Sequence, residues 1–141
     1  MSKIIQNAIR IKEHDIIMFS NSSTDYQEYE GYSIQGGLDY VMFNLPQGKT
    51  NDDIELLTIM DDDSMDKIMT KLIWGTYGKS FEKKLRMVKL FDCESDHLLK
   101  IMEQKNKPKI YDPTIKHILE YRRLQERKEK IQKIKQVMND K

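Results

Sequence analysis

The segment that follows Asp112 and Pro113 constrains the fold more than any other part of the chain. Asp112 is a favourable helix N-cap, and Pro113 suits the first helical position. Because no helix breaker follows before Asn139, we predict one helix of about 27 residues, or about 40 Å. Ile115 and Ile118 give its first turns an apolar stripe that suits packing on a domain.

Beyond Tyr121 the same predicted helix becomes mostly polar. Leu124, Ile131 and Met138 repeat every seven residues, with Ile134 at an intermediate seam position and Arg127 at the equivalent earlier one. Two heptads with a charged defect predict only a weak coiled coil. Such a helix rarely stands alone in water, so we expect it to pack on another chain or to fray.

Residues 3–45 predict a small antiparallel sheet, because short apolar stretches alternate with polar turns. The glycines Gly36 and Gly37 separate two of its strands, as a tight turn with positive φ or as a bulge. The expected strands are Ile4–Ile11, Ile16–Phe19, Gly31–Ile34 and Leu38–Phe43, with further strands at Ile54–Ile59 and Leu85–Phe91.

Two shorter helices complete the prediction. Apolar residues at helical spacing indicate a helix from Asp62–Ser64 to Ile73, broken by Gly75, and another from Asp96 to about Lys105. The fold class is therefore α+β: a small antiparallel sheet packed with two or three helices, and a long C-terminal helix extension. We expect residues 1–121 to form the α+β domain and residues 122–141 a basic helical extension.

The stretch from Leu72 to Lys79 is the best candidate for a binding site. It places the only Trp of the chain, Trp74, beside Gly75, Tyr77, Gly78 and Lys79, in a segment that we expect to be neither helix nor regular strand. Aromatic faces, close backbone approach and a cation suit a planar, negatively charged ligand. The alternative is that Trp74 seals the core and that the glycines only permit turns.

Charges are strongly segregated, although the net charge is only +1. Residues 52–66 hold seven acids and no base, whereas residues 122–141 hold eight bases and three acids. A basic cluster of Arg86, Lys89 and Lys79 surrounds a predicted strand and suits a phosphate, with Arg86 preferred for bidentate geometry. The alternative is a solvated face that balances the acidic connector.

The sequence argues against catalysis, metal binding and a membrane location. Cys93 is the only cysteine, and no histidine has metal-ligand spacing. The acids at residues 61–66 lack the spacing and the glycine of a calcium loop. No apolar run approaches the roughly 20 residues of a membrane span. We therefore expect a cytoplasmic, non-enzymatic protein without a cofactor or metal.

Several segments together resemble a family of small phage and prophage proteins. The resemblance covers most of residues 4–123 and is carried by IQNAIR at 5–10, DY at 25–26, GGLDY at 36–40, WGTYGK at 74–79, VKLFDC at 88–93, HL at 97–98 and YR at 121–122. Within this group the chain is similar to the phage Thoeris anti-defence sponges, small proteins of sheet and helix that oligomerise and sequester a cyclic ADP-ribose-type immune signal. Thr24, Met42 and Phe43 depart from the family pattern, which has His and two basic residues there, so a phosphate site on that strand is weakened.

The resemblance and the residues lead to one functional expectation. We expect a homo-oligomeric binding protein that sequesters a nucleotide-derived immune signal, of the cyclic ADP-ribose type or a cyclic oligonucleotide, without turnover. The expected ligand-binding residues are Trp74, Gly75, Tyr77, Lys79, Arg86, Gly36, Gly37 and Tyr40. The alternative is an accessory protein that binds nucleic acid or a host protein through the basic C-terminal helix.

Overall fold

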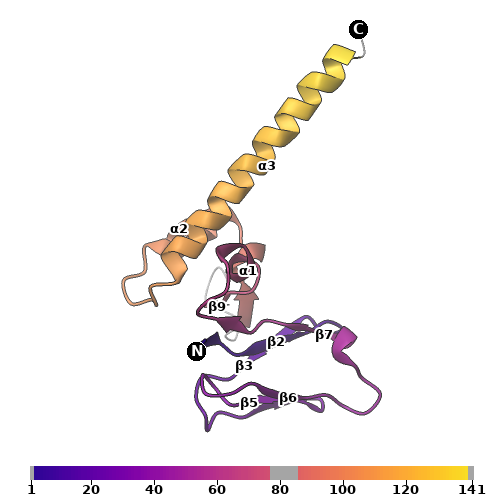
Figure 1. Ribbon diagram of the computed structural model, residues 1–141, viewed down its shortest axis with the longest axis vertical. Helices are drawn as coiled ribbons and strands as arrows, with labels where there is room; N and C mark the ends of the chain where they lie inside the picture. Colours follow the sequence, from indigo (N-terminus) through magenta and orange to yellow (C-terminus); the bar gives the residue numbers. More distant parts are fainter. Residues whose placement is uncertain (1, 77–85, 140–141) are drawn as a thin grey trace. The chain divides into compact units, whose positions relative to one another are not determined.

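The computed structural model describes residues 2–76 and 86–139. It confirms the α+β class: within these residues, small antiparallel sheets are joined by three α-helices, the last of them long (Figure 1). The chain forms two compact units, Met1–Asp92 and Cys93–Lys141.

The first unit contains the strands that the structure describes. Three of them form a sheet in the order β3-β2-β7, and three more form a sheet in the order β4-β5-β6. Two antiparallel strand pairs, β1 with β8 and β9 with β10, complete the unit. The bounds are β1 Ile4–Gln6, β2 Ala8–Ile11, β3 Ile16–Phe19, β4 Gln27–Tyr29, β5 Tyr32–Gln35, β6 Met42–Asn44, β7 Ile54–Leu56, β8 Ile59–Met60, β9 Ile73–Thr76 and β10 Arg86–Lys89. Short 3-10 helices occupy Asn51–Asp53 and Leu90–Asp92.

The β3-β2-β7 sheet is the middle layer of the first unit, because both of its faces are covered. Since successive side chains of a strand point to opposite faces, Ile9 and Met18 pack on the β4-β5-β6 sheet, in a cluster with Tyr32 and Ile34. The intervening residues pack on the other side, where Ala8, Ile17 and Phe19 meet Ile73 and Met87 of the β9–β10 pair. Burial on both faces explains why Ile16–Phe19 is apolar throughout instead of alternating.

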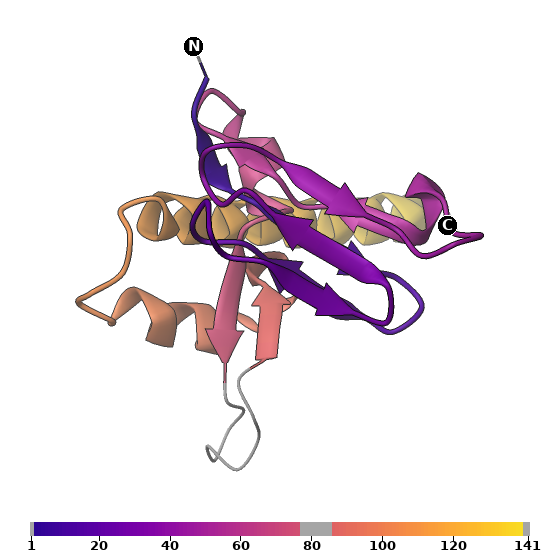
Figure 2. The same cartoon turned by 90° about the horizontal axis from the view of Figure 1, so that it is seen from below.

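The segment around Trp74 is a regular strand, so the expectation of an irregular bend was wrong. Trp74 lies opposite Val88, and Gly75 lies opposite Met87, in the antiparallel β9–β10 pair (Figure 2). The pairing extends from Ile73 opposite Lys89 to Thr76 opposite Arg86. Long-range pairing with β10 overrides the local signal of the glycine.

The first helix, α1, spans only Met65–Met69 and ends before the predicted Ile73. Ser64 is its N-cap, and its side chain accepts a hydrogen bond from the Lys67 amide. The helix ends early because Ile73 belongs to β9, where its amide donates to the buried Gln6 side chain at 3.0 Å. Gln6 in turn donates to the carbonyls of Leu57 at 2.7 Å and Lys71 at 2.8 Å, so one side chain joins three segments.

One strand prediction near residue 40 also needs correction, and one strand was missed. Leu38 to Val41 form a turn and its exit, and β6 begins only at Met42. Strand β4, Gln27–Tyr29, was not predicted, because its residues are polar or aromatic and two of its three side chains are only half-buried.

The second unit consists of α2, Ser95–Met102, and α3, Tyr111–Asn139. Leu98 and Ile101 of α2 are buried, as are Ile115 and Ile118 of α3, as the apolar stripes predict. Arg122 ties the two helices together, since its guanidinium donates to the Cys93 carbonyl at 2.7 Å and to the Ser95 hydroxyl at 2.9 Å. α3 is continuous across residue 121, and its contacts with the start of α2 extend as far as Arg122.

None of the helices formed by the described residues combines the length and the apolar character that a membrane span requires.

Candidate functional site

The described part of the first unit contains an open groove that runs along strand β3. Its cavity volume is about 670 Å³. We call it the β3 groove, and its lining residues are His14, Asp15, Ile16, Ile17, Phe19, Gln27, Arg86 and Met87.

The groove exists because β3 is an edge strand. Among the described strands, β3 pairs only with β2, so its other edge is left without a strand partner. Ile16 lies on one face of the strand, and Ile17 and Phe19 lie on the other, yet all three line the groove. The groove therefore follows the strand edge, between the β4-β5-β6 layer and the β9–β10 layer.

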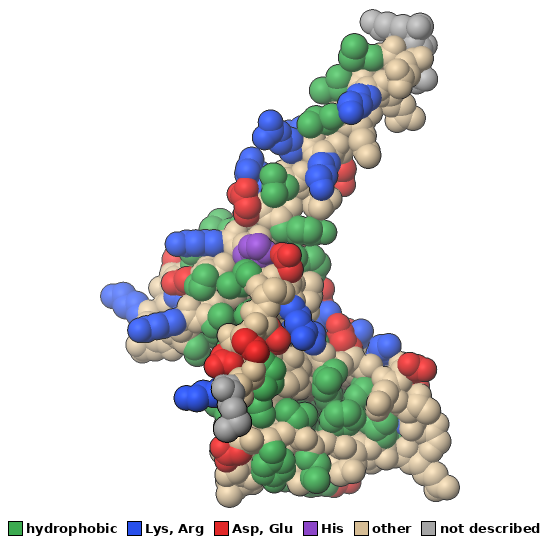
Figure 3. Space-filling view, viewed as in Figure 1, with side chains coloured by type: hydrophobic (Ala, Val, Ile, Leu, Met, Phe, Trp, Pro, Cys, Tyr) green, Lys and Arg blue, Asp and Glu red, His purple; other side chains and the backbone are tan. Residues whose placement is uncertain are grey.

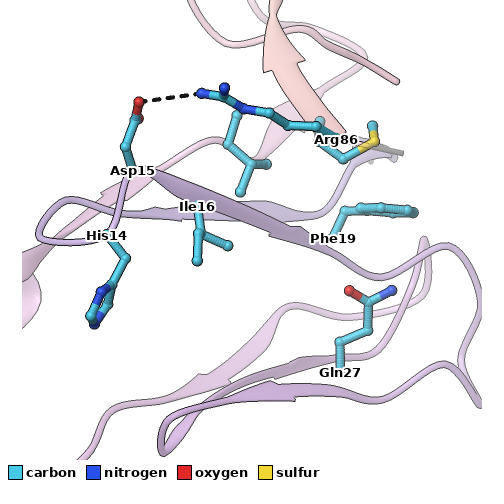
Figure 4. A pocket seen from close by; sticks show the side chains of 8 residues that line it. His14, Asp15, Ile16, Phe19, Gln27 and Arg86 are labelled. Carbon is cyan, nitrogen blue, oxygen red and sulfur yellow. Dashed lines mark ion pairs between the residues drawn. The ribbon is translucent and has the colours of Figure 1, made fainter. Parts of the chain in front are cut away.

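Polar groups reach the groove from three different segments. Figure 4 shows Arg86 extending from β10 toward Asp15, while Gln27 points from β4 toward Phe19. Asp15 sits in the tight turn between β2 and β3 with φ of 50°, in the left-handed region. The site thus combines a guanidinium, a carboxylate and an amide with an aromatic ring.

The ion pair at the groove is weak enough to open. Arg86 and Asp15 are 3.6 Å apart, and their side chains are 66% and 67% exposed. Pairs this exposed contribute about 0–1 kcal/mol, because water and salt screen them. A phosphate that forms two charge-assisted hydrogen bonds with Arg86 would therefore compete with Asp15.

His14 precedes Asp15 in the same turn and contacts both Tyr29 and Glu13. Its ring meets Tyr29 edge to face, with centroids 5.5 Å apart, and its Nε2 lies 3.1 Å from a carboxylate oxygen of Glu13. No Ser, Thr, Cys or Lys is among the described lining residues, whereas the Asp15 carboxylate and the His14 imidazole are. To a ligand the groove offers an apolar floor, a cation and hydrogen-bonding groups.

Of the predicted site residues that the structure describes, only Arg86 lines the groove. Trp74 and Gly75 are half-buried in β9 and are not lining residues. Tyr77 and Lys79 lie outside the described residues. The described part of the chain thus has a groove on β3 that contains Arg86, and the binding role expected of Trp74, Tyr77 and Lys79 stays a prediction.

Gly36 and Gly37 form a tight turn in which the protein's own backbone comes close. Gly36 has φ of 104°, and a Cβ there would lie 1.9 Å from the Tyr40 carbonyl oxygen. Gly37 has φ of 54°, and its Cβ would lie 2.2 Å from the carbonyl carbon of Ser22. The space that we expected a ligand to use beside these glycines is thus filled by Tyr40 and Ser22, whereas the Tyr40 side chain itself is exposed.

Asn7 holds this turn, a role that no local sequence pattern predicts. Its buried side-chain amide lies within hydrogen-bond distance of three carbonyls, those of Gln35 at 3.1 Å, Gly37 at 3.0 Å and Tyr40 at 3.2 Å. Asn7 occupies the position between β1 and β2. Its place in the IQNAIR segment is therefore explained by the turn that it supports 28 to 33 residues away.

Lys89, part of the predicted basic cluster, forms an ion pair with Glu55. Its ammonium lies 3.1 Å from one Glu55 oxygen, and Arg10, directly opposite Glu55 on β2, donates to Glu55 at 2.7 Å. Burial raises the pKa of the Glu55 carboxyl, but the hydrogen bonds from Arg10 and Lys89 outweigh it, so the pKa lies below its usual value. This ion cluster joins β10 to the middle sheet. Lys89 therefore has a structural role, whereas Arg86 lines the groove.

Within residues 2–76 and 86–139, no group of three or more His, Cys, Asp or Glu side chains is arranged to hold a metal ion. Comparisons of the chain with protein-family models, with curated proteins and with solved structures found no match. The resemblance to small phage proteins therefore stays a hypothesis.

Proposed function

We propose that this protein binds a small, anionic, nucleotide-derived ligand in the β3 groove and holds it without chemical change. The observation that carries the proposal is the convergence of Arg86, Phe19 and Gln27 on one groove of about 670 Å³. Small-molecule sites typically have volumes of about 300–1,000 Å³, apolar walls and a few convergent polar groups.

Each of these groups suits one part of a nucleotide. A guanidinium binds phosphate through two parallel hydrogen bonds. The Phe19 ring offers apolar surface for a base, and the Gln27 amide both donates and accepts hydrogen bonds, as a base edge requires. Asp15 can accept hydrogen bonds from ribose hydroxyls once Arg86 turns to the phosphate.

The resemblance to anti-defence sponges suggests the class of ligand. A cyclic ADP-ribose-type signal carries a diphosphate, riboses and a base, and its capture would make this chain a phage anti-defence protein.

Calorimetric titration with cyclic ADP-ribose tests the site. Arg86→Ala should weaken binding by about tenfold to a hundredfold, because hydrogen bonds to charged groups contribute about 1.5–3 kcal/mol. Asp15→Asn should bind at least as tightly as the original chain, because it removes a negative charge that faces the phosphate.

The matched control is Arg123→Ala, which removes another exposed arginine from an exposed ion pair, with Glu120. It should leave binding unchanged. Equal affinity of the Arg86→Ala variant and the original chain would rule out the groove.

The fate of the ligand separates capture from catalysis. The protein is incubated with extract from cells that produce the signal, purified and heat-denatured, and the released compound is analysed by mass spectrometry. Recovery of the intact signal supports the proposal, whereas recovery of a hydrolysed or rearranged product would show an enzyme.

A further inference from the structure

The C-terminal part of α3 exposes apolar side chains along one side. Leu124, Ile131, Ile134 and Met138 are between 42% and 70% exposed. Because they recur at spacings of seven and of three or four residues, they lie on one stripe of the helix, which we call the α3 seam. Figure 3 shows hydrophobic and basic side chains side by side along this part of the helix.

The α3 seam has the geometry of a coiled-coil stripe. Leu124, Ile131 and Met138 occupy successive a positions, and Arg127 and Ile134 occupy the d positions. A stripe this narrow buries its side chains against one facing helix. A membrane surface would instead favour a broad apolar face with aromatic residues, and the seam has neither.

The residues that flank the seam are all basic, apart from one valine. Lys128 and Lys135 occupy the e positions, and Arg123 and Lys130 occupy g positions, with Val137 at the last g. All four basic residues are exposed. The acids of this region, Glu126 and Glu129, fall on the opposite side of the helix, at c and f.

This pattern disfavours a second copy of the same helix. In a parallel pair, g residues meet e residues of the partner helix, and in an antiparallel pair e meets e and g meets g. Every such pair in a homodimer of α3 would join two bases or a base and a valine. Like charges at these positions select against self-association and in favour of a partner of opposite charge.

We propose that the α3 seam docks an amphipathic helix of another protein, with apolar core residues and acidic residues at its flanking positions. The acidic side chains of that helix would pair with the four basic residues, and its apolar core would bury the seam. Nucleic acid would pair with the basic side chains but leave the four apolar side chains in water, so it fits the surface less well. The inference does not depend on the proposed ligand site, because it concerns other residues.

A synthetic acidic heptad peptide tests the proposal with the full chain. The peptide has Leu and Ile at a and d, Glu at e and g, and a fluorescent label for anisotropy. Two control peptides keep either the core with Lys at e and g, or the Glu flanks with Ser at the core. Binding of the first peptide alone supports the proposal, and equal binding of the core-less acidic peptide would overturn it.

A pair of charge reversals on neighbouring residues provides the matched test in the protein. Lys135→Glu changes a flanking position, whereas Lys133→Glu changes a c position on the far side. Replacing an attractive pair by a repulsive one should weaken peptide binding by about three- to fivefold in Lys135→Glu, with a much smaller effect in Lys133→Glu. Equal losses would show nonspecific attraction and refute the docking surface.

Two further outcomes would overturn the proposal. Tighter binding of a 30-base-pair DNA duplex than of the acidic peptide, with equal effects of the two reversals, would assign the helix to nucleic acid. A dimer that light scattering detects, and that Ile131→Asn dissociates, would assign the seam to a second copy.

Discussion

Substitution of Gly36 tests whether the fold or a bound ligand requires a glycine at this position. The residue begins the turn after β5 with φ of 104°, which L side chains rarely adopt. Its carbonyl accepts hydrogen bonds from the amides of Asp39 at 3.0 Å and Tyr40 at 3.2 Å. An alanine there must change the backbone angle or displace the Tyr40 carbonyl, or both.

The expected loss of stability has two parts. The unfavourable φ contributes about 1–2 kcal/mol. A Cβ placed 1.9 Å from the Tyr40 oxygen forces that carbonyl to move, which breaks its hydrogen bond from Asn7 and removes about 1 kcal/mol more. We therefore expect Gly36→Ala to lower the free energy of unfolding of the first unit by about 2–3 kcal/mol.

Gly48→Ala is the matched control. Gly48 has φ of 86°, but no atom lies within 4 Å of the position of its Cβ. This variant has the cost of the unfavourable φ alone, about 1–2 kcal/mol. Urea unfolding followed by fluorescence of Trp74, which belongs to the first unit, measures both. The two variants differ by the lost hydrogen bond, about 1 kcal/mol. With a slope of about 1–3 kcal/mol per molar urea, their midpoints should differ by about 0.3–1 M.

The result also bears on function. If Gly36 serves a ligand, the alanine variant would keep its stability and lose binding. If the turn serves the fold, stability falls first, and binding falls only to the extent that the first unit unfolds. Equal midpoints for Gly36→Ala and Gly48→Ala would refute the steric argument.

Three other predictions follow from the contacts of single side chains. Because the pKa of Glu55 is lowered in the folded protein, its contribution to stability is present above the unfolded pKa and lost as the pH falls through the folded pKa. The urea midpoint of Glu55→Gln should therefore depend less on pH across the acid range, and an unchanged pH dependence would count against the ion cluster. Gln6→Leu leaves three buried backbone groups without their partner and should lower the stability of the first unit by about 2–4 kcal/mol, again measured by Trp fluorescence; a loss below 1 kcal/mol would argue against this role. Truncation after Tyr121 removes the contacts of Arg122 with the start of α2, whereas truncation after Arg123 keeps them, so only the first should lower the calorimetric melting temperature of the second unit, and equal temperatures would contradict this.

Local sequence signals were sufficient for the elements whose ends are set locally. β3 occupies the predicted residues Ile16–Phe19, and α1 begins at Met65, directly after the predicted start at Asp62–Ser64. α3 begins at Tyr111, one residue before the predicted N-cap Asp112. Turn residues and helix caps act within a few residues, so they can be recognised without knowing the rest of the fold.

The same signals failed where a distant segment decides the conformation. Trp74-Gly75 has the composition of a loop, yet it pairs with β10 and becomes a strand. The apolar spacing up to Ile73 is helical, yet the amide of Ile73 is held by Gln6, 67 positions earlier. No local pattern reveals such a contact, because its free energy comes from burying a polar group with the right partner.

The candidate site was only partly predictable for the same reason. Arg86 was identified by its charge, since guanidinium chemistry is visible in a sequence. Phe19 and Gln27 were not identified, because Phe19 lies on the edge strand β3 and Gln27 faces the groove from β4, which depends on how the strands are arranged. An edge strand flanked by two layers creates a groove wherever its neighbours do not cover it. The residues to test first are therefore those that face this edge from other layers, and among the described residues these are Gln27, Arg86 and Met87.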